Sequence, residues 1–197
     1  MFALLRAALT MVAVFTLLLG IVAPLAVTGI AGLAFAHEAR GSLIQREGRV
    51  VGSSLIGQNF TGERWFHPRP SATTEADPDT AGQTRAAPYN AASSAASQLG
   101  PTSSALREAL TERVAALGGG PVPADAATAS GSGLDPHISP ENARRQIARV
   151  AQARGLPEAR LADLVARHTE GRAFGLFGEP RVNVLQLNLA LDSLPAR

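Results

Sequence analysis

The sequence predicts an α+β protein in which one N-terminal transmembrane helix precedes a single small soluble α+β domain. The first observation is an uncharged apolar stretch over residues 7–36. The second is a pair of short β-branched segments around a Gly turn soon after it, and the third is a series of capped helical patterns in the C-terminal half. We therefore divide the chain into a short N-terminal segment 1–6, a transmembrane helix 7–36 and a soluble domain 37–197.

The N-terminal stretch is long enough to cross a bilayer. Thirty uncharged residues lie between Arg6 and His37, and about 20 apolar residues suffice to span the hydrocarbon core. Pro24 lies in mid-span and should kink the helix. A cleavable signal peptide is the alternative, because Ala34 and Ala36 have the small-x-small spacing of a cleavage site. Signal-peptide cores run to only about 15 apolar residues, so we favour a retained anchor in the lipid bilayer.

Small residues recur along this helix at a spacing of four. Such stripes allow a second helix to approach closely in lipid, although Gly and Ala are common enough in membrane helices to fall in register by chance. We take Gly20, Thr28 and Gly32 as candidates for contact with a partner helix. The whole stripe consists of Thr16, Gly20, Pro24, Thr28, Gly32 and Ala36.

The soluble domain opens with a predicted hairpin. Residues 42–45 and 49–52 are short apolar runs that flank a turn containing Gly48. Residues 71–100 are rich in Ala, Ser, Thr, Asp and Pro and lack apolar periodicity, so we expect a long loop or a segment ordered by a partner.

Three helices and a mixed tail complete the domain. Each helix has apolar residues on one face, a capping residue or Pro at its start and Gly at its end. The tail is ambiguous between strand alternation and a helical face; we favour a strand at 181–183 and then a helix, because Asn183 and Gln186 resemble a capping box. The predicted helices begin after Thr102 or Ser103, at Pro140 after Ser139, and at Pro157, and they end at Gly118, Gly155 and Gly171.

Composition excludes several functions. The chain has no Cys and no Lys, so its 18 basic residues are all Arg. Without Lys there is no phosphate-binding loop of the GxxxxGK[ST] type and no Schiff-base chemistry. The formal net charge of +2, with no basic run interleaved with aromatics, gives no indication of nucleic-acid binding.

No catalytic signature is present. Ser132 and His137 lie close together with Asp135 between them, but the GxSxG motif is absent and a triad is assembled in space rather than within a few residues. Asp135 and His137 lack further ligands at metal-binding spacing, so we predict no metal site. The residues favour an accessory subunit, with an anchored hydrolase using Ser132 and His137 and a free-standing ligand-binding module as alternatives.

The segment 57–71 is the best candidate for a protein interface. It combines aromatic residues and Arg, which are enriched at interface anchors, with irregular backbone punctuated by Pro and Gly. Local core packing of Phe60 and Phe66 is an equally weighted alternative. The candidate interface residues are Asn59, Phe66, His67 and Arg69.

Five segments behind the single span carry a resemblance to a known family: residues 52–60, 66–72, 128–139, 149–154 and 182–192. In this order they resemble the C subunit of the Kdp potassium-transporting ATPase, the KdpC family. The resemblance covers nearly the whole chain, although Pro68 stands where the family usually has Gly in Phe-His-Gly-Arg-Pro.

The resemblance implies an accessory role without turnover. In that family's complex a channel-like subunit selects potassium and a P-type ATPase subunit is phosphorylated, so K+ and Mg-ATP would be handled by these two partners and no cofactor by this chain. The C subunit would be needed for assembly and stability. A second proposal attached to the family is a catalytic chaperone that raises the ATP affinity of the ATPase subunit; Gln146 would then contact nucleotide, and the alternative is an ordinary exposed helix residue.

Sidedness separates these two roles. The basic start, the long apolar run and the uncut Ala34-x-Ala36 site are typical of an export signal, and large domains cross membranes largely regardless of charge. We therefore expect the chain to reside in the bacterial inner membrane, with the domain from His37 onward outside the cytoplasm.

Overall fold

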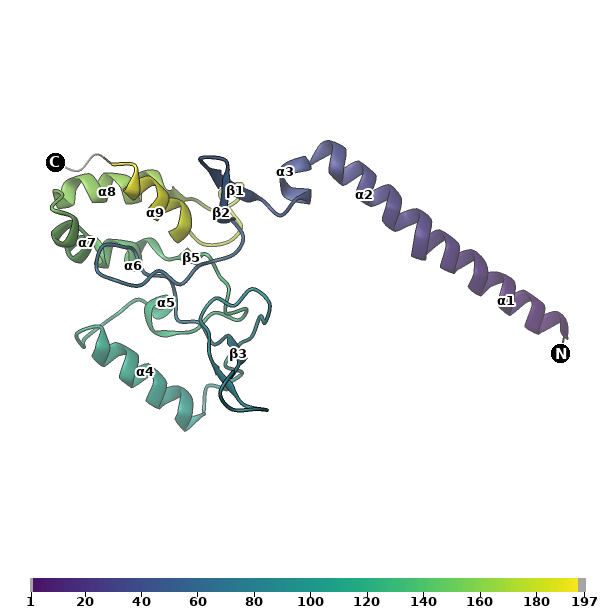
Figure 1. Ribbon diagram of the computed structural model, residues 1–197, viewed down its shortest axis with the longest axis horizontal. Helices are drawn as coiled ribbons and strands as arrows, with labels where there is room; N and C mark the ends of the chain where they lie inside the picture. The colour runs from purple at the N-terminus through teal and green to yellow at the C-terminus, as the bar shows by residue number, and fades with distance from the viewer. Residues whose placement is uncertain (1, 195–197) are drawn as a thin grey trace. The chain divides into compact units, whose positions relative to one another are not determined.

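The computed structural model describes residues 2–194 and consists of two compact units, Met1–Val51 and Gly52–Arg197, which we describe separately. The first unit is a long helix followed by a short helix and a hairpin. The second contains the helices and strands of the soluble domain (Figure 1). The predicted α+β class with a single N-terminal apolar helix is confirmed.

The N-terminal helix is continuous from Phe2 to Ala34, with a mean hydropathy of 2.4 in its most apolar window and no burial there. It consists of α1 (Phe2–Leu17), a π turn η1 (Leu18–Val22) and α2 (Ala23–Ala34). The helix therefore starts before the predicted residue 7. It ends at Phe35, whose φ of −135° and ψ of 51° are not helical, and α3 (Ala36–Ala39) comes next.

The π turn lies where Pro24 disturbs the helix. Proline lacks an N–H and its ring clashes with the carbonyl of the residue four positions before it, which here is Gly20. A wider turn relieves that crowding, and the N–H of Ala23 accordingly bonds the carbonyl of Leu18, five residues back. The distortion expected at Pro24 thus takes the form of a π turn.

The predicted hairpin is confirmed as β1 (Leu43–Arg46) and β2 (Arg49–Ser53), which form a two-stranded sheet. Its two turn residues, Glu47 and Gly48, have φ values of 52° and 75°. Positive φ at both positions is what a tight two-residue hairpin requires.

The core of the soluble domain lies between a small sheet and the C-terminal helices. The sheet has the order β5-β7-β6 and is antiparallel, with His137 opposite Asn183 and Thr169 opposite Val182. Figure 1 shows α7, α8 and α9 grouped together, with α4 apart from them. The elements are α5 (Ala124–Ala127), β5 (His137–Ile138), α6 (Pro140–Arg145), α7 (Ile147–Arg154), α8 (Glu158–Arg167), β6 (Thr169–Glu170), β7 (Arg181–Asn183) and α9 (Val184–Asp192).

The core is aliphatic apart from one aromatic ring. Side chains from α6 to α9 and from the sheet surround Phe66, which reaches them from an irregular segment far away in the sequence. The main members of the cluster are Phe66, Ile138, Ile147, Val150, Leu161, Leu164, Val165, Val182, Val184, Leu187 and Leu191.

The predicted helix starts are confirmed, but the second helix is interrupted and the third ends early. Ser103 caps α4 (Ser104–Ala116), Ser139 caps α6, and Asn183 accepts a bond from the N–H of Gln186 at the start of α9. The helix predicted from Pro140 to Gly155 is instead interrupted at Gln146, between α6 and α7. The third helix ends at His168 rather than Gly171 because β6 begins immediately afterwards.

The apolar face of α4 is only partly covered. No residue of this helix is buried, and Leu106, Leu110 and Val114 line an open groove of about 620 Å³. The shared apolar face was predicted correctly, but among the described residues it packs on little else.

The prediction of a long loop at 71–100, or of a segment ordered by a partner, missed a short hairpin. The segment contains a hairpin of β3 (Thr74–Ala76) and β4 (Thr84–Ala86), with Thr74 opposite Ala86. Buried Thr73 orders the residues after β4, because its hydroxyl donates to the carbonyl of Ala87 and accepts from the N–H of Asn90. Short strands of Thr, Ala and charged residues carry no apolar alternation, which is why the pattern missed them.

Candidate functional site

Two side-chain amides hold the irregular segment 57–71 against the helices. The N–H of Phe66 donates to Asn188 Oδ1 at 2.9 Å, and Asn188 Nδ2 donates to the carbonyl of Phe66 at 2.9 Å. This reciprocal pair reproduces the bonding of one β-strand residue to its neighbour. Because Phe66 and Asn188 are both fully buried, α9 satisfies a backbone that water cannot reach.

Gln146 makes the same type of contact to the next residue. Its Oε1 accepts from the N–H of His67 at 2.7 Å, and its Nε2 donates to the carbonyl of His67 at 3.1 Å. The remaining donor goes to Asn142 Oδ1 at 3.2 Å, and Oε1 also accepts from Arg149 at 2.8 Å. Both donors and both acceptor positions of this amide are therefore used, and the residue is only 4% exposed. We call the Asn188 and Gln146 contacts the amide clamp.

Two arginines of α7 extend the attachment. Arg149 donates to the carbonyls of Glu63 and Trp65 at 2.8 and 2.9 Å. Arg154 donates to the carbonyl of Arg64 at 2.8 Å, and its guanidinium lies 4.5 Å from the centre of the Trp65 ring. A cation so close to an aromatic face is favourable. The backbone from Glu63 to His67 is thus bonded to side chains of the helical layer.

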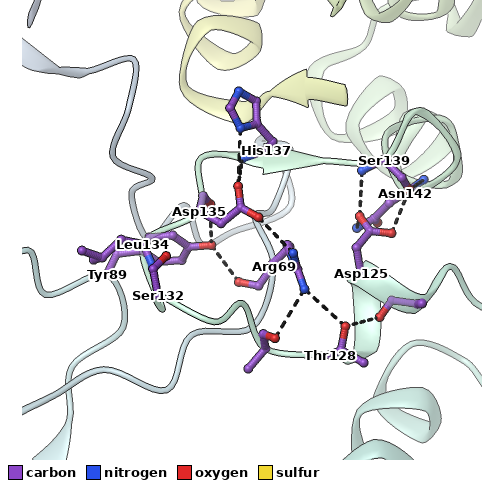
Figure 2. Close-up of polar contacts among 12 residues, drawn as sticks. Arg69, Tyr89, Asp125, Thr128, Ser132, Leu134, Asp135, His137, Ser139 and Asn142 are labelled. Atoms are coloured by element: carbon purple, nitrogen blue, oxygen red, sulfur yellow. Dashed lines mark hydrogen bonds and ion pairs between the residues drawn. The ribbon is translucent and has the colours of Figure 1, made fainter. Parts of the chain in front are cut away.

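Arg69 joins a second group of loops (Figure 2). Its guanidinium pairs with Asp135 at 2.9 Å and donates to the hydroxyl of Thr128 and the carbonyl of Ala129 at 3.4 and 3.3 Å. The Tyr89 hydroxyl donates to the carbonyl of Arg69 at 2.9 Å. These contacts connect the 57–71 segment to residues 20 to 66 positions further along the chain.

The carboxylate of Asp135 is held in its charged form. Burial alone would raise its pKa, but hydrogen bonds from His137 and the contact with Arg69 outweigh burial and lower the pKa below its ordinary value. Tyr89 behaves oppositely: burial, aided by the charge of Asp135, raises the pKa of its hydroxyl. Both groups therefore keep the protonation state that their hydrogen bonds need at neutral pH.

Close packing at Gly57 fixes the start of the segment. A Cβ there would lie 2.8 Å from the carbonyl oxygen of Asp135 and would overlap the Tyr89 ring. The Gly57 N–H also donates to the carbonyl of Leu134 at 2.8 Å. Only glycine permits this approach without displacing the loop that carries Asp135.

Asp125 forms a separate capping contact beside this group, visible on the right of Figure 2. Its carboxylate accepts from the N–H and the hydroxyl of Ser139 at 2.8 and 2.7 Å, and from Asn142 at 3.0 Å. Asn142 in turn accepts from Gln146. The start of α6 is therefore linked to the amide clamp through polar side chains.

The predicted interface residues fall into different environments. Phe66 lies in the core, which is the alternative that the sequence left open, and Arg69 is largely engaged by its own domain. The His67 ring bonds the carbonyl of Gly62 at 2.8 Å. Asn59 lines a cavity of about 320 Å³ together with His67, Arg69 and Gln146. Contact of Asn59, His67 and Arg69 with a partner stays a prediction.

The expectation of an ordinary exposed helix residue at Gln146 is wrong, because the side chain is buried and fully bonded. The residues of the alternative hydrolase are also engaged. Ser132 Oγ accepts from the N–H of Leu134, while His137 Nδ1 lies 3.4 Å from Asp135. Among the described residues, no hydrogen bond joins Ser132 to His137.

The small residues of the anchor helix leave open space around them within the described chain. A Cβ at Gly32 would meet nothing within 4 Å, and one at Gly20 would meet only the Thr16 methyl at 3.9 Å. Four residues of an α-helix overshoot one turn by about 40°, so a strict spacing of four drifts around the axis. The wide turn at 18–22 offsets part of that drift and brings the two halves of the stripe closer to one line.

Sequence reasoning missed Asn188 and Tyr89. The signal for Asn188 was a single amide within the apolar run Leu187-Asn188-Leu189, on a helix otherwise buried on that face. A polar residue at a core position needs a buried partner, and the backbone of Phe66 is that partner. Tyr89 is the chain's one tyrosine, within a segment of low apolar content.

The chain is similar to known proteins over nearly its whole length. A family model described as the K+-transporting ATPase, c chain, matches residues 5–193. The chain belongs to the KdpC family. KdpC proteins are subunits of the Kdp potassium-transporting ATPase complex, and the single apolar helix fits a single-pass membrane protein.

Similar KdpC chains come from several bacteria. The chain is 60% identical over 197 residues to the potassium-transporting ATPase KdpC subunit of Methylorubrum extorquens, covering 98% of each chain. It is 58% identical to the KdpC subunit of Methylobacterium nodulans, again over 98% of each chain. Identity to the KdpC subunit of Bradyrhizobium diazoefficiens is 52% over 98% of each chain.

Proposed function

We propose that this chain is a non-catalytic assembly subunit that holds the channel-like subunit and the P-type ATPase subunit of a potassium-uptake complex together. The observation that carries the proposal is the use of polar side chains. Catalysis or ligand binding would need polar side chains that are free. Here they bond the domain's own loops instead, as Arg69, Gln146 and Asn188 do. Loops held in this way suit a domain that docks, and the domain is joined in sequence to an apolar helix suited to packing in lipid.

K+ and Mg-ATP are then handled by the two partner subunits, and this chain needs no cofactor. Neither Ser132 nor His137 is arranged as a nucleophile and its base, which is why assembly is preferred to hydrolysis.

The test is co-purification followed by reconstitution. A tagged chain isolated from detergent-solubilised membranes should bring down two large membrane proteins. Cells that lack the chain should lose both the assembled complex and high-affinity potassium uptake, and both should return on complementation. Normal assembly and uptake without the chain would overturn the proposal.

We also propose that the domain from His37 onward lies outside the cytoplasm, on the inner membrane of a bacterium. The support is the export-like N-terminal segment, whose apolar helix begins next to the chain start. Ser97 is exposed, and the chain contains no Cys, so Ser97→Cys gives a single labelling site. A membrane-impermeant thiol reagent should label this variant in whole cells. Labelling confined to inverted vesicles would place the domain in the cytoplasm.

This topology bears on the catalytic-chaperone alternative. ATP is cytoplasmic, so an external domain affects ATP affinity only by coupling through the membrane-spanning segments. The bonding of Gln146 supports the same conclusion, because contact with nucleotide would require this amide to release His67 or Asn142. We therefore assign Gln146 to the stability of the domain that docks.

A further inference from the structure

The β6–β7 hairpin ends in an exposed apolar tip. Between β6 and β7, at residues 171–180, Phe174 is 93% exposed, Leu176 74% and Phe177 68%. Among the large apolar side chains described from residue 52 onward, these are the most exposed. Three such side chains within four residues form a patch of the kind that marks an interaction site.

The tip is ordered without a partner. The N–H of Ala173 donates to the carbonyl of Phe177 at 2.8 Å, and the N–H of Phe177 donates back to Ala173 at 3.0 Å. Below them, Arg172 binds both carboxylate oxygens of Glu179 at 2.8 and 2.9 Å. The conformation of the tip is therefore set before binding, which lowers the entropy lost on association.

The backbone at the tip keeps a non-glycine residue in the left-handed region. Phe174 has a φ of 54°, followed by Gly175 at 74°. A bulky residue at positive φ is uncommon and costs free energy. The conformation directs the Phe174 ring outward, where it contacts almost nothing of its own chain.

Charge favours a protein pocket over a lipid surface. Loops and helices that bind bilayer interfaces combine apolar residues with free basic side chains. Here the two arginines of the hairpin are both neutralised, Arg172 by Glu179 and Arg181 by Glu170 at 2.9 Å. Residues 171–180 also contain no Trp or Tyr, the residues enriched at membrane interfaces.

We propose that Phe174, Leu176 and Phe177 insert into an apolar pocket on the extracytoplasmic surface of another subunit of the Kdp complex. The inference rests on the proposed assembly function and names the surface through which the domain docks. Aromatic anchors at the centre of a patch with a polar rim are the usual form of an interface hot spot. The ion pairs at the base of the hairpin supply that rim.

Site-specific photo-crosslinking in intact membranes tests the contact directly. A benzophenone analogue of phenylalanine in place of Phe174 keeps an aromatic apolar side chain at the tip. Illumination should give a covalent adduct with one large subunit of the complex. The same analogue at Leu99, an exposed apolar position outside the hairpin, is the matched control and should give little adduct. Adducts only with lipid, or only with a second copy of this chain, would overturn the proposal.

Serine substitutions measure how much the tip contributes. Phe174→Ser and Phe177→Ser should each lower recovery of the large subunits in stringent detergent about tenfold, while Leu99→Ser should leave recovery unchanged. Because the tip is exposed, the thermal melts of all three variants should match that of the parent chain. If the parent chain recovers both large subunits and the tip variants recover them equally well, the docking inference is overturned but the assembly function is not. If the parent chain recovers neither, the assembly function itself fails.

Discussion

Replacing Gln146 with alanine removes one half of the amide clamp. The variant loses both hydrogen bonds to the His67 peptide, together with the contacts to Asn142 and Arg149. A typical intramolecular hydrogen bond stabilises a protein by about 1 kcal/mol net. Arg149 keeps its bonds to backbone carbonyls and water can reach part of His67, so we expect a total loss of roughly 2–3 kcal/mol. For a chain of this size that lowers Tm by roughly 5–10 °C.

The measurement is thermal unfolding of the full-length protein in detergent, followed by circular dichroism. Gln152→Ala is the matched control, because Gln152 is exposed on α7, which begins directly after Gln146, and its Tm should stay close to that of the parent. A Gln146→Ala variant that melts like the control would refute the clamp as a stabilising contact.

Asn188→Ala distinguishes a structural role of Gln146 from nucleotide contact. Asn188 holds the neighbouring peptide from a different helix, and among the described residues it does not line the cavity beside Gln146. If Gln146 acts only by stabilising the domain, both variants should weaken assembly and should alter the apparent ATP affinity of the complex to a similar degree. Weaker ATP affinity in Gln146→Ala with an unchanged Tm, together with normal affinity in Asn188→Ala, would revive direct contact.

Three further outcomes are expected from the contacts described. Gly20→Leu and Gly32→Leu have room within the chain, so they should leave membrane insertion intact and reduce co-purification with the channel-like subunit; normal assembly of both would show that the stripe is coincidental. Gly57→Ala should destabilise the domain by about 1–3 kcal/mol because its methyl group would meet Tyr89, as a urea titration would measure. The lowered pKa of Asp135 stabilises the fold above its unfolded pKa of about 4, and this stability is lost as the pH falls through the folded pKa. The Tm of Asp135→Asn should therefore drop less steeply in acid than that of the parent, and equal slopes would contradict this.

The helix starts could be predicted because their signals are local. Ser103 and Ser139 each accept a bond from an N–H three residues later, and the same holds for Asn183. A capping contact depends on neighbours within one turn, so residue type and spacing suffice to find it. The N-terminal span was equally accessible, since length and hydropathy alone define it.

The amide clamp could not be predicted because the two peptides that it holds are distant in the sequence from Asn188 and Gln146. Asn188 bonds a backbone 122 residues away, and Gln146 bonds one 79 residues away. An isolated Gln or Asn gives no indication of which peptide it will bond. Every residue carries the same backbone groups, so the sequence does not mark the partner. The ion pair of Arg69 was missed for the same reason, because Asp135 lies 66 residues away.

The same contacts constrain how an external domain could influence the use of ATP. If the amide clamp stabilises a domain that docks outside the membrane, any effect on nucleotide affinity is a coupling free energy between two separate sites. Such coupling is reciprocal. ATP binding to the pump subunit must then change the affinity of the Kdp complex for this domain by the same factor. The role in assembly and the proposed effect on ATP would then share one coupling free energy. Measuring the domain's dissociation with and without nucleotide would give its size.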